Sequence, residues 1–136
     1  MQRRNNTRIR RRRTLAGVLA LVWMTVIFLL SAVPGASYPS HPSFLNYVAH
    51  FGEYLVLAVL LTVLFTGSRF KRWQIVLLAL GLAALYAVSD ELHQLFVPGR
   101  SSDPVDVLTD AIGASVGALL TASVLKRIDG RRKRRM

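Results

Sequence analysis

The sequence predicts an all-α membrane protein, a four-helix transmembrane bundle with antiparallel helices and both termini in the cytoplasm. The 136 residues fit one domain. The hydrophobic residues, 52% of the chain, gather into four blocks of roughly 17 to 21 residues, and each block matches the ~30 Å core of a bilayer at about 1.5 Å per helical residue. The turn at residues 67–72 is short enough to hold the second and third helices antiparallel. The basic residues then set the orientation.

Basic residues are concentrated in three segments of the chain. Seventeen of the 18 lie in the two termini and between the second and third blocks, and the exception is Arg100. With both termini inside, all seventeen are cytoplasmic, as the positive-inside rule requires. A net charge of +11 would favour nucleic-acid binding in a soluble chain. Here topology and anionic lipid account for the charge, so we expect membrane lipids and no nucleic acid as partners.

The first transmembrane helix is predicted over about residues 14–33. It follows a basic tail, residues 1–13, which we expect to be disordered on its own and to lie against anionic headgroups. The apolar run is long for a signal peptide, and Pro34 is badly placed for cleavage. We therefore expect a retained helix, followed by a proline-rich outer loop in which His41 is solvated.

The second helix is predicted over about residues 46–66. At 100° per residue, its outer end places His50, Glu53 and Tyr54 on one face, which we expect to look into the bundle. Glu53 lies inside an apolar run, where a merely solvated carboxylate would be costly. We therefore expect Glu53 to have a partner or a function. A tight basic turn then leads into the next helix.

The third helix is predicted over about residues 73–95. Trp73 is expected to anchor it at the cytoplasmic interface, and Gly81 with the nearby alanines permits close helix contact. The helical pattern continues into a polar outer end before Pro98 and Gly99 stop it. Asp90 and Glu91 are expected nearer to water, with one of them facing inward.

The fourth helix is predicted over about residues 104–125, before a second basic tail, residues 126–136. Ser102 or Asp103 is expected to cap it, with Pro104 in the first position. One face carries, at positions i, i+4, i+7 and i+11, the residues Asp106, Asp110, Gly113 and Gly117. The glycines form a close-packing surface against another helix, which turns both aspartates toward the bundle interior.

The outer helix ends meet at one depth because the helices alternate in direction. Five of the seven acidic residues lie between Ser89 and Asp110, and nothing comparable faces the cytoplasm. The residues expected to bind a ligand in this outer-leaflet polar pocket are His50, Glu53, Tyr54, Asp90, Glu91, Gln94, Arg100, Asp106 and Asp110. The candidates for a catalytic role are Glu53, Asp90, Glu91 and Asp106.

Several interpretations of this pocket stay open. It is a structural cluster in which Arg100 neutralises acids, or a binding site in which Arg100 reads a phosphate or carboxylate. It is also compatible with catalysis, with a carboxylate or histidine as general base. A metal site would use His50, Glu53, His93 and Asp106. Two histidines on different helices are thin support, and cysteine is absent, so we assign no metal and no cofactor.

Two segments, HFGEYLVLAVLL from His50 and YAVSDELHQLFVPGRSSDPVDVLTDAIGASVGAL from Tyr86, resemble the VanZ-like family of small bacterial membrane proteins. The likeness covers about the last two-thirds of the chain. It rests on the histidine and tyrosine of one helix, a D-E-x-x-Q-x-F-x-P-x-R segment, and an aspartate-led helix that contains glycine. By position, the resemblance implies that the signature polar residues are Glu53, Asp90, Glu91, Gln94, Arg100 and Asp106.

The resemblance implies an integral protein of the bacterial inner membrane, and the family's namesake is associated with teicoplanin resistance. Asp110 stands where the family usually has asparagine, which makes this site more acidic. We expect the protein to bind or handle a cell-envelope component, such as a lipid-linked ligand, and to affect glycopeptide susceptibility. One alternative is an intramembrane enzyme acting on a lipid phosphate or an envelope acyl or amide bond. Another is a structural partner of a second membrane protein through the glycine-rich face, and homo-oligomers are left open.

Overall fold

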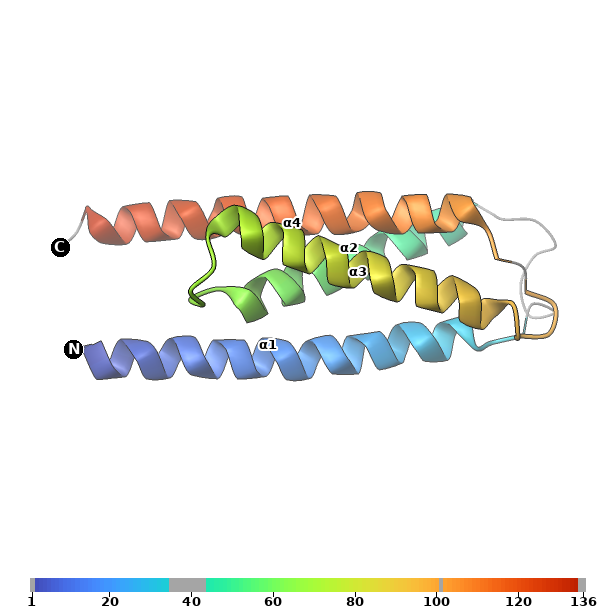
Figure 1. Ribbon diagram of the computed structural model, residues 1–136, viewed down its shortest axis with the longest axis horizontal. Helices are drawn as coiled ribbons and strands as arrows, with labels where there is room; N and C mark the ends of the chain where they lie inside the picture. Colours follow the sequence, from blue (N-terminus) through green and yellow to red (C-terminus); the bar gives the residue numbers. More distant parts are fainter. Residues whose placement is uncertain (1, 35–43, 101, 135–136) are drawn as a thin grey trace.

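The structure is a computed structural model that describes residues 2–34, 44–100 and 102–134. Within these ranges it contains four helices and no strand: α1 (Gln2–Ser31), α2 (Phe44–Phe65), α3 (Arg72–Gln94) and α4 (Pro104–Lys133). The start of α1, the end of α4 and the α2–α3 turn lie at one end of the bundle, which we call the terminal end (Figure 1). The opposite end, where α1 and α3 finish and α2 and α4 begin, is the distal end. His41, the expected loop histidine, lies outside the described residues.

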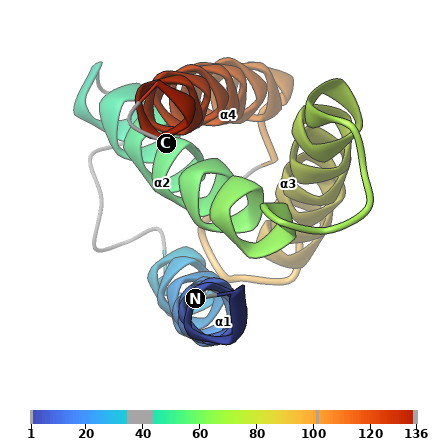
Figure 2. The same ribbon diagram turned by 90° about the vertical axis from the view of Figure 1, so that its left-hand side faces the viewer.

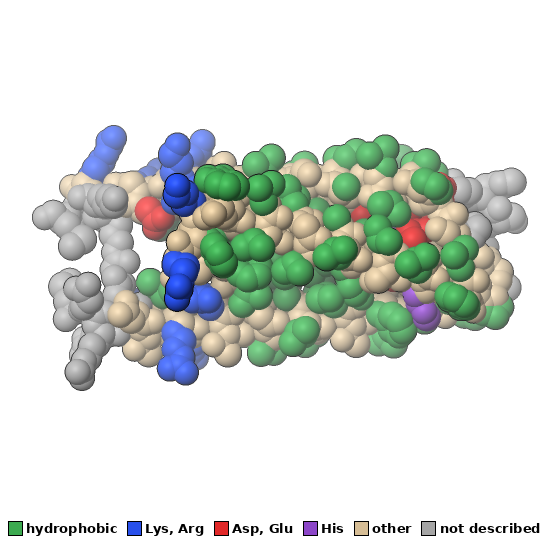
Figure 3. All heavy atoms as spheres, viewed as in Figure 1, with side chains coloured by type: hydrophobic (Ala, Val, Ile, Leu, Met, Phe, Trp, Pro, Cys, Tyr) green, Lys and Arg blue, Asp and Glu red, His purple; other side chains and the backbone are tan. Residues whose placement is uncertain are grey.

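All four helices are long and apolar enough to cross a membrane. At most 39% of the most apolar window of any of them is buried inside the protein, so most apolar side chains face outward. Examples are Leu21, Leu85 and Leu120. Figure 3 shows these apolar side chains along the length of the bundle and the basic side chains gathered at the terminal end. The predicted four-helix membrane fold is confirmed.

The first and last helices are longer than predicted. Residues 2–13, expected as a disordered tail, continue α1, and α4 runs on to Lys133 instead of ending near residue 125. Arginine and lysine are good helix formers, and extending an existing helix avoids the cost of a new nucleus. Arg13 also donates from Nε to the Leu64 carbonyl at 2.9 Å, which ties α1 to α2. The other helix ends lie within two residues of their predicted positions.

Helix α2 is at the centre of the bundle and packs against the other three helices (Figure 2). In the described part of the chain, α1 packs on α2 and α3 but not on α4. Large side chains of α2 fill the core, among them Tyr54 and Leu57. Small residues on α3 and α4 face them, namely Ala79, Ala83, Ala87, Ala114 and Ala118. This pairing of large with small residues lets the helices pack without voids.

Gly113 and Gly117 bring α4 unusually close to α2. A Cβ added at Gly113 would collide with the backbone carbonyl of Phe51, and one at Gly117 would collide with that of Leu55. The predicted close-packing surface is therefore confirmed, and its partner is α2 of the same chain. Gly81 has open space around its Cβ position, so the predicted role of Gly81 in close helix contact is wrong.

Glycine and aspartate set the ends of the α3–α4 connection. Gly99 has φ of +75°, a left-handed conformation that other residues rarely adopt. Asp103 precedes α4, and its Oδ1 accepts a hydrogen bond from the backbone N–H of Val105 at 2.8 Å. This confirms Asp103 as the cap of α4. The α2–α3 turn likewise uses a left-handed glycine, Gly67, with φ of +77°.

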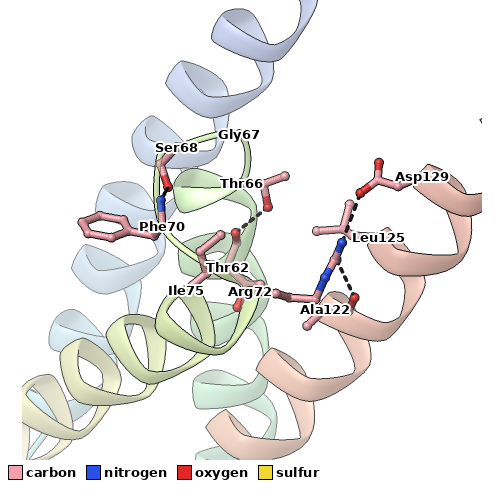
Figure 4. Close-up of a pocket in the computed structure, with 10 residues that line it drawn as sticks. All are labelled: Thr62, Thr66, Gly67, Ser68, Phe70, Arg72, Ile75, Ala122, Leu125 and Asp129. Atoms are coloured by element: carbon pink, nitrogen blue, oxygen red, sulfur yellow. Dashed lines mark hydrogen bonds and ion pairs between the residues drawn. The ribbon is translucent and has the colours of Figure 1, made fainter. Parts of the chain in front are cut away.

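A small pocket opens at the terminal end, between the α2–α3 turn and α4 (Figure 4). Its polar side chains already bond to the protein. Thr62 and Thr66 each donate to a backbone carbonyl of α2 at 2.7 and 2.8 Å. Arg72 donates to the Ala122 carbonyl at 3.0 Å and to Asp129 at 3.2 Å. Arg72 thereby ties α3 to α4, and these polar groups already have partners within the protein.

Candidate functional site

Buried polar side chains gather at the distal end. Among the described residues, Thr62 is the one buried polar residue that lies elsewhere. The others are Ser31, His50, Asp90, Glu91, Gln94, Asp106 and Asp110. Each prolongs the inward face of its helix, since on α3 the alanine stripe runs into Asp90 and Glu91 and on α2 the core face ends at His50. The helices therefore bring polar groups to one level.

His50 lies between two aspartates of α4. Its Nδ1 is 3.1 Å from Asp110 Oδ1, and its Nε2 is 3.9 Å from Asp106 Oδ2. The first distance is a hydrogen bond and the second is too long for one. Glu91 of α3 joins them, because one ligand atom from each of His50, Glu91 and Asp106 lies within 4.8 Å of the others. We call His50, Glu91, Asp106 and Asp110 the histidine–carboxylate cluster.

Two further groups orient the carboxylates of this cluster. Asn46 donates from Nδ2 to the two oxygens of Asp106 at 3.3 and 3.4 Å. The backbone N–H of Asp103 donates to Glu91 Oε2 at 2.8 Å. Asn46 was missed from the sequence. It lies one helical turn before His50, on the same face, and this spacing was the signal that could have found it.

Asp90 belongs to a second group, at the contact between α1 and α3. Its Oδ2 accepts hydrogen bonds from Ser31 Oγ at 2.7 Å and from Gln94 Nε2 at 3.3 Å. Asp90 and Glu91 are both 3% exposed, so the expectation that only one of them faces inward is wrong. Adjacent residues point about 100° apart, and here one meets α1 and the other meets α4. Ser31, at the end of an apolar helix, was not predicted.

Glu53 and Arg100 flank the cluster and are half-buried. The Glu53 carboxyl group interacts electrostatically with His50, Asp110 and Arg100. Arg100 also interacts electrostatically with Asp106. The Glu53 backbone carbonyl accepts a hydrogen bond from Trp23 Nε1 at 2.8 Å, which fixes α1 against this part of α2.

Tyr54 is fully buried below the cluster. Its ring centroid lies 6.2 Å from that of Tyr86. The Tyr86 hydroxyl donates to the Met24 carbonyl at 2.5 Å. The Tyr54 hydroxyl has no hydrogen-bond partner among the described residues, so Tyr54 presents a polar atom inside an apolar core.

The metal-ligand set considered from the sequence is only partly brought together. His50 and Asp106 meet, but His93 turns toward α1, where its ring lies 4.4 Å from that of Phe28. Glu53 does not join the group of close ligand atoms in the described chain, and Glu91 takes that place. The sequence placed His93 at the right depth but could not show which neighbour it faces.

The sequence model of the VanZ/LLP1 family matches residues 16–126. The chain belongs to the VanZ/LLP1 family. The matched segment takes in the histidine–carboxylate cluster and part of every candidate span, so this is a multi-pass membrane protein of that family, and the resemblance found in the sequence is confirmed. No curated protein and no solved structure matches the chain.

In this VanZ/LLP1 protein, several buried polar atoms of the distal end lack a hydrogen-bond partner among the described residues. They include Asp90 Oδ1, Glu91 Oε1 and Asp110 Oδ2. A buried carboxylate oxygen without a partner is costly. Five carboxylates, counting Glu53, Asp90, Glu91, Asp106 and Asp110, stand near one guanidinium and one imidazole. The site therefore has spare hydrogen-bond acceptors and an excess of acid.

Proposed function

We propose that this VanZ/LLP1 protein binds or handles a cell-envelope component in an outer-leaflet polar pocket of the bacterial cytoplasmic membrane. One observation carries the proposal: α2, α3 and α4 bury a histidine and several carboxylates at one depth, with acceptor atoms left unpaired. Ionisable residues inside a membrane bundle are costly to keep and are typical of functional sites. The terminal end, whose polar groups are satisfied, offers no comparable arrangement in the described chain.

The orientation follows from the charges. In the described ranges of the chain, every basic residue except Arg100 lies toward the terminal end, where Figure 3 shows Lys and Arg side chains gathered. The positive-inside rule then places that end in the cytoplasm. The distal end accordingly faces the outer side of the membrane, where envelope components assembled on lipid carriers are exposed.

The chemistry of the pocket suits a ligand with both anionic and hydrogen-bonding groups. Arg100 offers a planar cation that reads phosphate or carboxylate. The cluster carboxylates accept hydrogen bonds from amines or sugar hydroxyls. A lipid-linked ligand would present these groups at the depth of the cluster while its chain stays in the bilayer, and this ligand class joins the membrane lipids as the expected partner.

A second candidate function is an intramembrane hydrolase, and the His50–Asp110 hydrogen bond favours it. A carboxylate that holds an imidazole by one nitrogen leaves the other nitrogen as a general base. His50 would take a proton from water attacking a lipid phosphate or an acyl or amide bond, and Arg100 would stabilise the negative charge that develops. Sequence reasoning allowed a carboxylate or a histidine as the base and named carboxylates as the candidates, whereas this geometry favours the histidine.

The glycine-rich face of α4 is not open to a partner protein. Gly113 and Gly117 are buried against the backbone of α2. No second protein can reach this face without separating α2 from α4.

Drug susceptibility tests the proposal directly. Cells would express wild type, Glu53→Gln, Arg100→Ala or the control Asp129→Asn at matched membrane levels, and their growth would be measured in teicoplanin and in vancomycin. We expect wild type and Asp129→Asn to protect, chiefly against teicoplanin, and the two pocket variants to lose protection while remaining folded. If none of the four protects, the glycopeptide role is rejected. If the pocket variants protect as well as wild type, the pocket is not the functional site.

A further inference from the structure

The orientation of His50 points to a use of the cluster that the proposed function does not specify. An ionised carboxylate only accepts hydrogen bonds, so the 3.1 Å contact with Asp110 places the proton on Nδ1 of His50. In the neutral ring, which is the form that binds a metal, Nε2 presents its lone pair on the opposite side. That side faces Asp106 Oδ2 at 3.9 Å. A cation between the two atoms, either a proton on Nε2 or a metal ion, makes this contact attractive.

The hydrogen bond from His50 Nδ1 to Asp110 is the usual arrangement behind a metal-binding histidine. Histidine ligands donate their second ring N–H to a carboxylate or carbonyl, which fixes the tautomer and aims the free nitrogen at the metal. Asp110 is the carboxylate that accepts this hydrogen bond, and it is 1% exposed. The close packing of α2 and α4 at Gly113 and Gly117 holds it beside His50. Asp110 would therefore act as a positioning residue behind His50.

Two carboxylates complete a set of three ligands. Glu91 and Asp106 each offer an oxygen in a group whose atoms, with the His50 nitrogen, all lie within 4.8 Å of one another. Zinc bonds to nitrogen and oxygen are about 2.0–2.2 Å long, so the ligands of a tetrahedral ion stand roughly 3.3–3.6 Å apart. The ligand atoms would have to approach one another by at most roughly 1.5 Å, which rotation of the two carboxylate side chains can supply.

The unpaired oxygens are an independent sign that a cation belongs here. Glu91 is 3% exposed, and its Oε1 has no hydrogen-bond partner among the described residues. Its other oxygen is held by the Asp103 backbone N–H, and Asp106 is held by Asn46. The protein thus holds both carboxylates in place and leaves Glu91 with unused acceptor capacity close to His50. Buried charges are ordinarily paired or bound to metal.

We propose that His50 Nε2, Glu91 and Asp106 bind one divalent first-row transition-metal ion such as Zn²⁺, with Asp110 orienting the histidine. An imidazole with two carboxylates suits zinc better than magnesium or calcium, which prefer oxygen ligands throughout. Three protein ligands leave a coordination position open for water or for a ligand oxygen. The inference rests on the proposed function for what fills that position: a phosphate or carboxylate of the envelope component.

Metal content of the purified protein tests the inference. Full-length protein, purified in detergent through an affinity tag without histidine, would be stripped with a chelator and dialysed against Zn²⁺. Elemental analysis should then find one zinc per wild-type chain and none in His50→Ala, Glu91→Gln or Asp106→Asn. The matched control is His93→Phe, which removes a histidine at the same end, keeps the ring against Phe28, and should retain the zinc.

Asp110→Asn separates a positioning role from a structural one. It keeps the side-chain shape and all three ligands, and it should weaken zinc affinity about 10- to 100-fold. Substitution of Co²⁺ in wild type alone gives a second measurement, since a visible absorption band that Zn²⁺ abolishes does not depend on any variant folding. A wild-type chain with no more zinc than His50→Ala, or with no cobalt band, overturns the inference. Neither readout uses antibiotics, so failure of the metal site is distinguishable from failure of the envelope function.

Discussion

Gly113 offers the sharpest test of how the site is assembled, because its replacement by alanine adds a single methyl group at the α2–α4 contact. That Cβ would collide with the carbonyl oxygen of Phe51 and lie 3.0 Å from both its carbonyl carbon and its Cα. Backbone atoms cannot rotate away as a side chain can. The added methyl therefore has to push the two helices apart.

The size of the effect can be worked from these distances. Carbon atoms in contact normally stand about 3.5–4.0 Å apart, so α2 and α4 must separate by roughly 0.5–1 Å at this level, which forfeits a quarter to a half of the dispersion energy of the contacts nearby. Overpacking of this kind typically costs about 1–3 kcal/mol. Alanine also improves helix propensity by about 1 kcal/mol over glycine, and this gain must be removed from the comparison.

Gly81→Ala is the matched control, because it makes the same change inside α3 where nothing lies within 4 Å of the added Cβ. The propensity gain is common to both variants and cancels. We expect Gly113→Ala to be about 1–3 kcal/mol less stable than Gly81→Ala in thermal or denaturant unfolding in detergent micelles. Equal stabilities for the two variants would refute the close α2–α4 contact and, with it, the placement of Asp110 beside His50.

Three further predictions concern contacts described above. Ser31→Ala should destabilise the protein by about 1–2 kcal/mol, because buried Asp90 loses the shorter of its two hydrogen bonds. The same substitution made in an Asp90→Asn background should cost less, and equal costs in the two backgrounds would contradict the pairing. Tyr86→Phe should cost about 0.5–1.5 kcal/mol, since it removes the hydrogen bond to Met24 without changing the ring, and unchanged unfolding would argue against that bond. Asp129→Asn should change the free energy of unfolding by less than about 0.5 kcal/mol, because the side chains of the ion pair, Arg72 and Asp129, are 43% and 64% exposed. A larger loss would show that this ion pair contributes substantially to stability at the terminal end.

The sequence was sufficient for the four helices and for the depth of the site. Apolar blocks of membrane-spanning length and the distribution of arginines are properties of the chain itself. The period of the α-helix also placed Asp106, Asp110, Gly113 and Gly117 on one face, and the structure buries all four. Local patterns of this kind need no knowledge of neighbouring helices.

What the sequence could not supply is which neighbour each face meets. Asp90 and Glu91 differ by one helical step, yet one bonds to α1 and the other points to α4. His93 was in the ligand set considered from the sequence and Glu91 was not, yet His93 packs against Phe28 of α1 and Glu91 lies beside His50. Ser31 and Asn46 are ordinary in their own segments and become relevant only through a carboxylate about 60 residues away in the chain. Such choices depend on how the helices are arranged.

The central position of α2 bears on the order in which the protein is made. Helix α4 is synthesised last, and it brings both aspartates that flank His50 and both glycines that accommodate the backbone of α2. Until α4 is in place, His50 has neither aspartate beside it, and the backbone of Phe51 and Leu55 lacks the glycines that pack on it. Arrival of α4 is therefore the step that completes the site. A chain that ends before α4 would therefore lack both aspartates of the cluster and both glycines of the close contact.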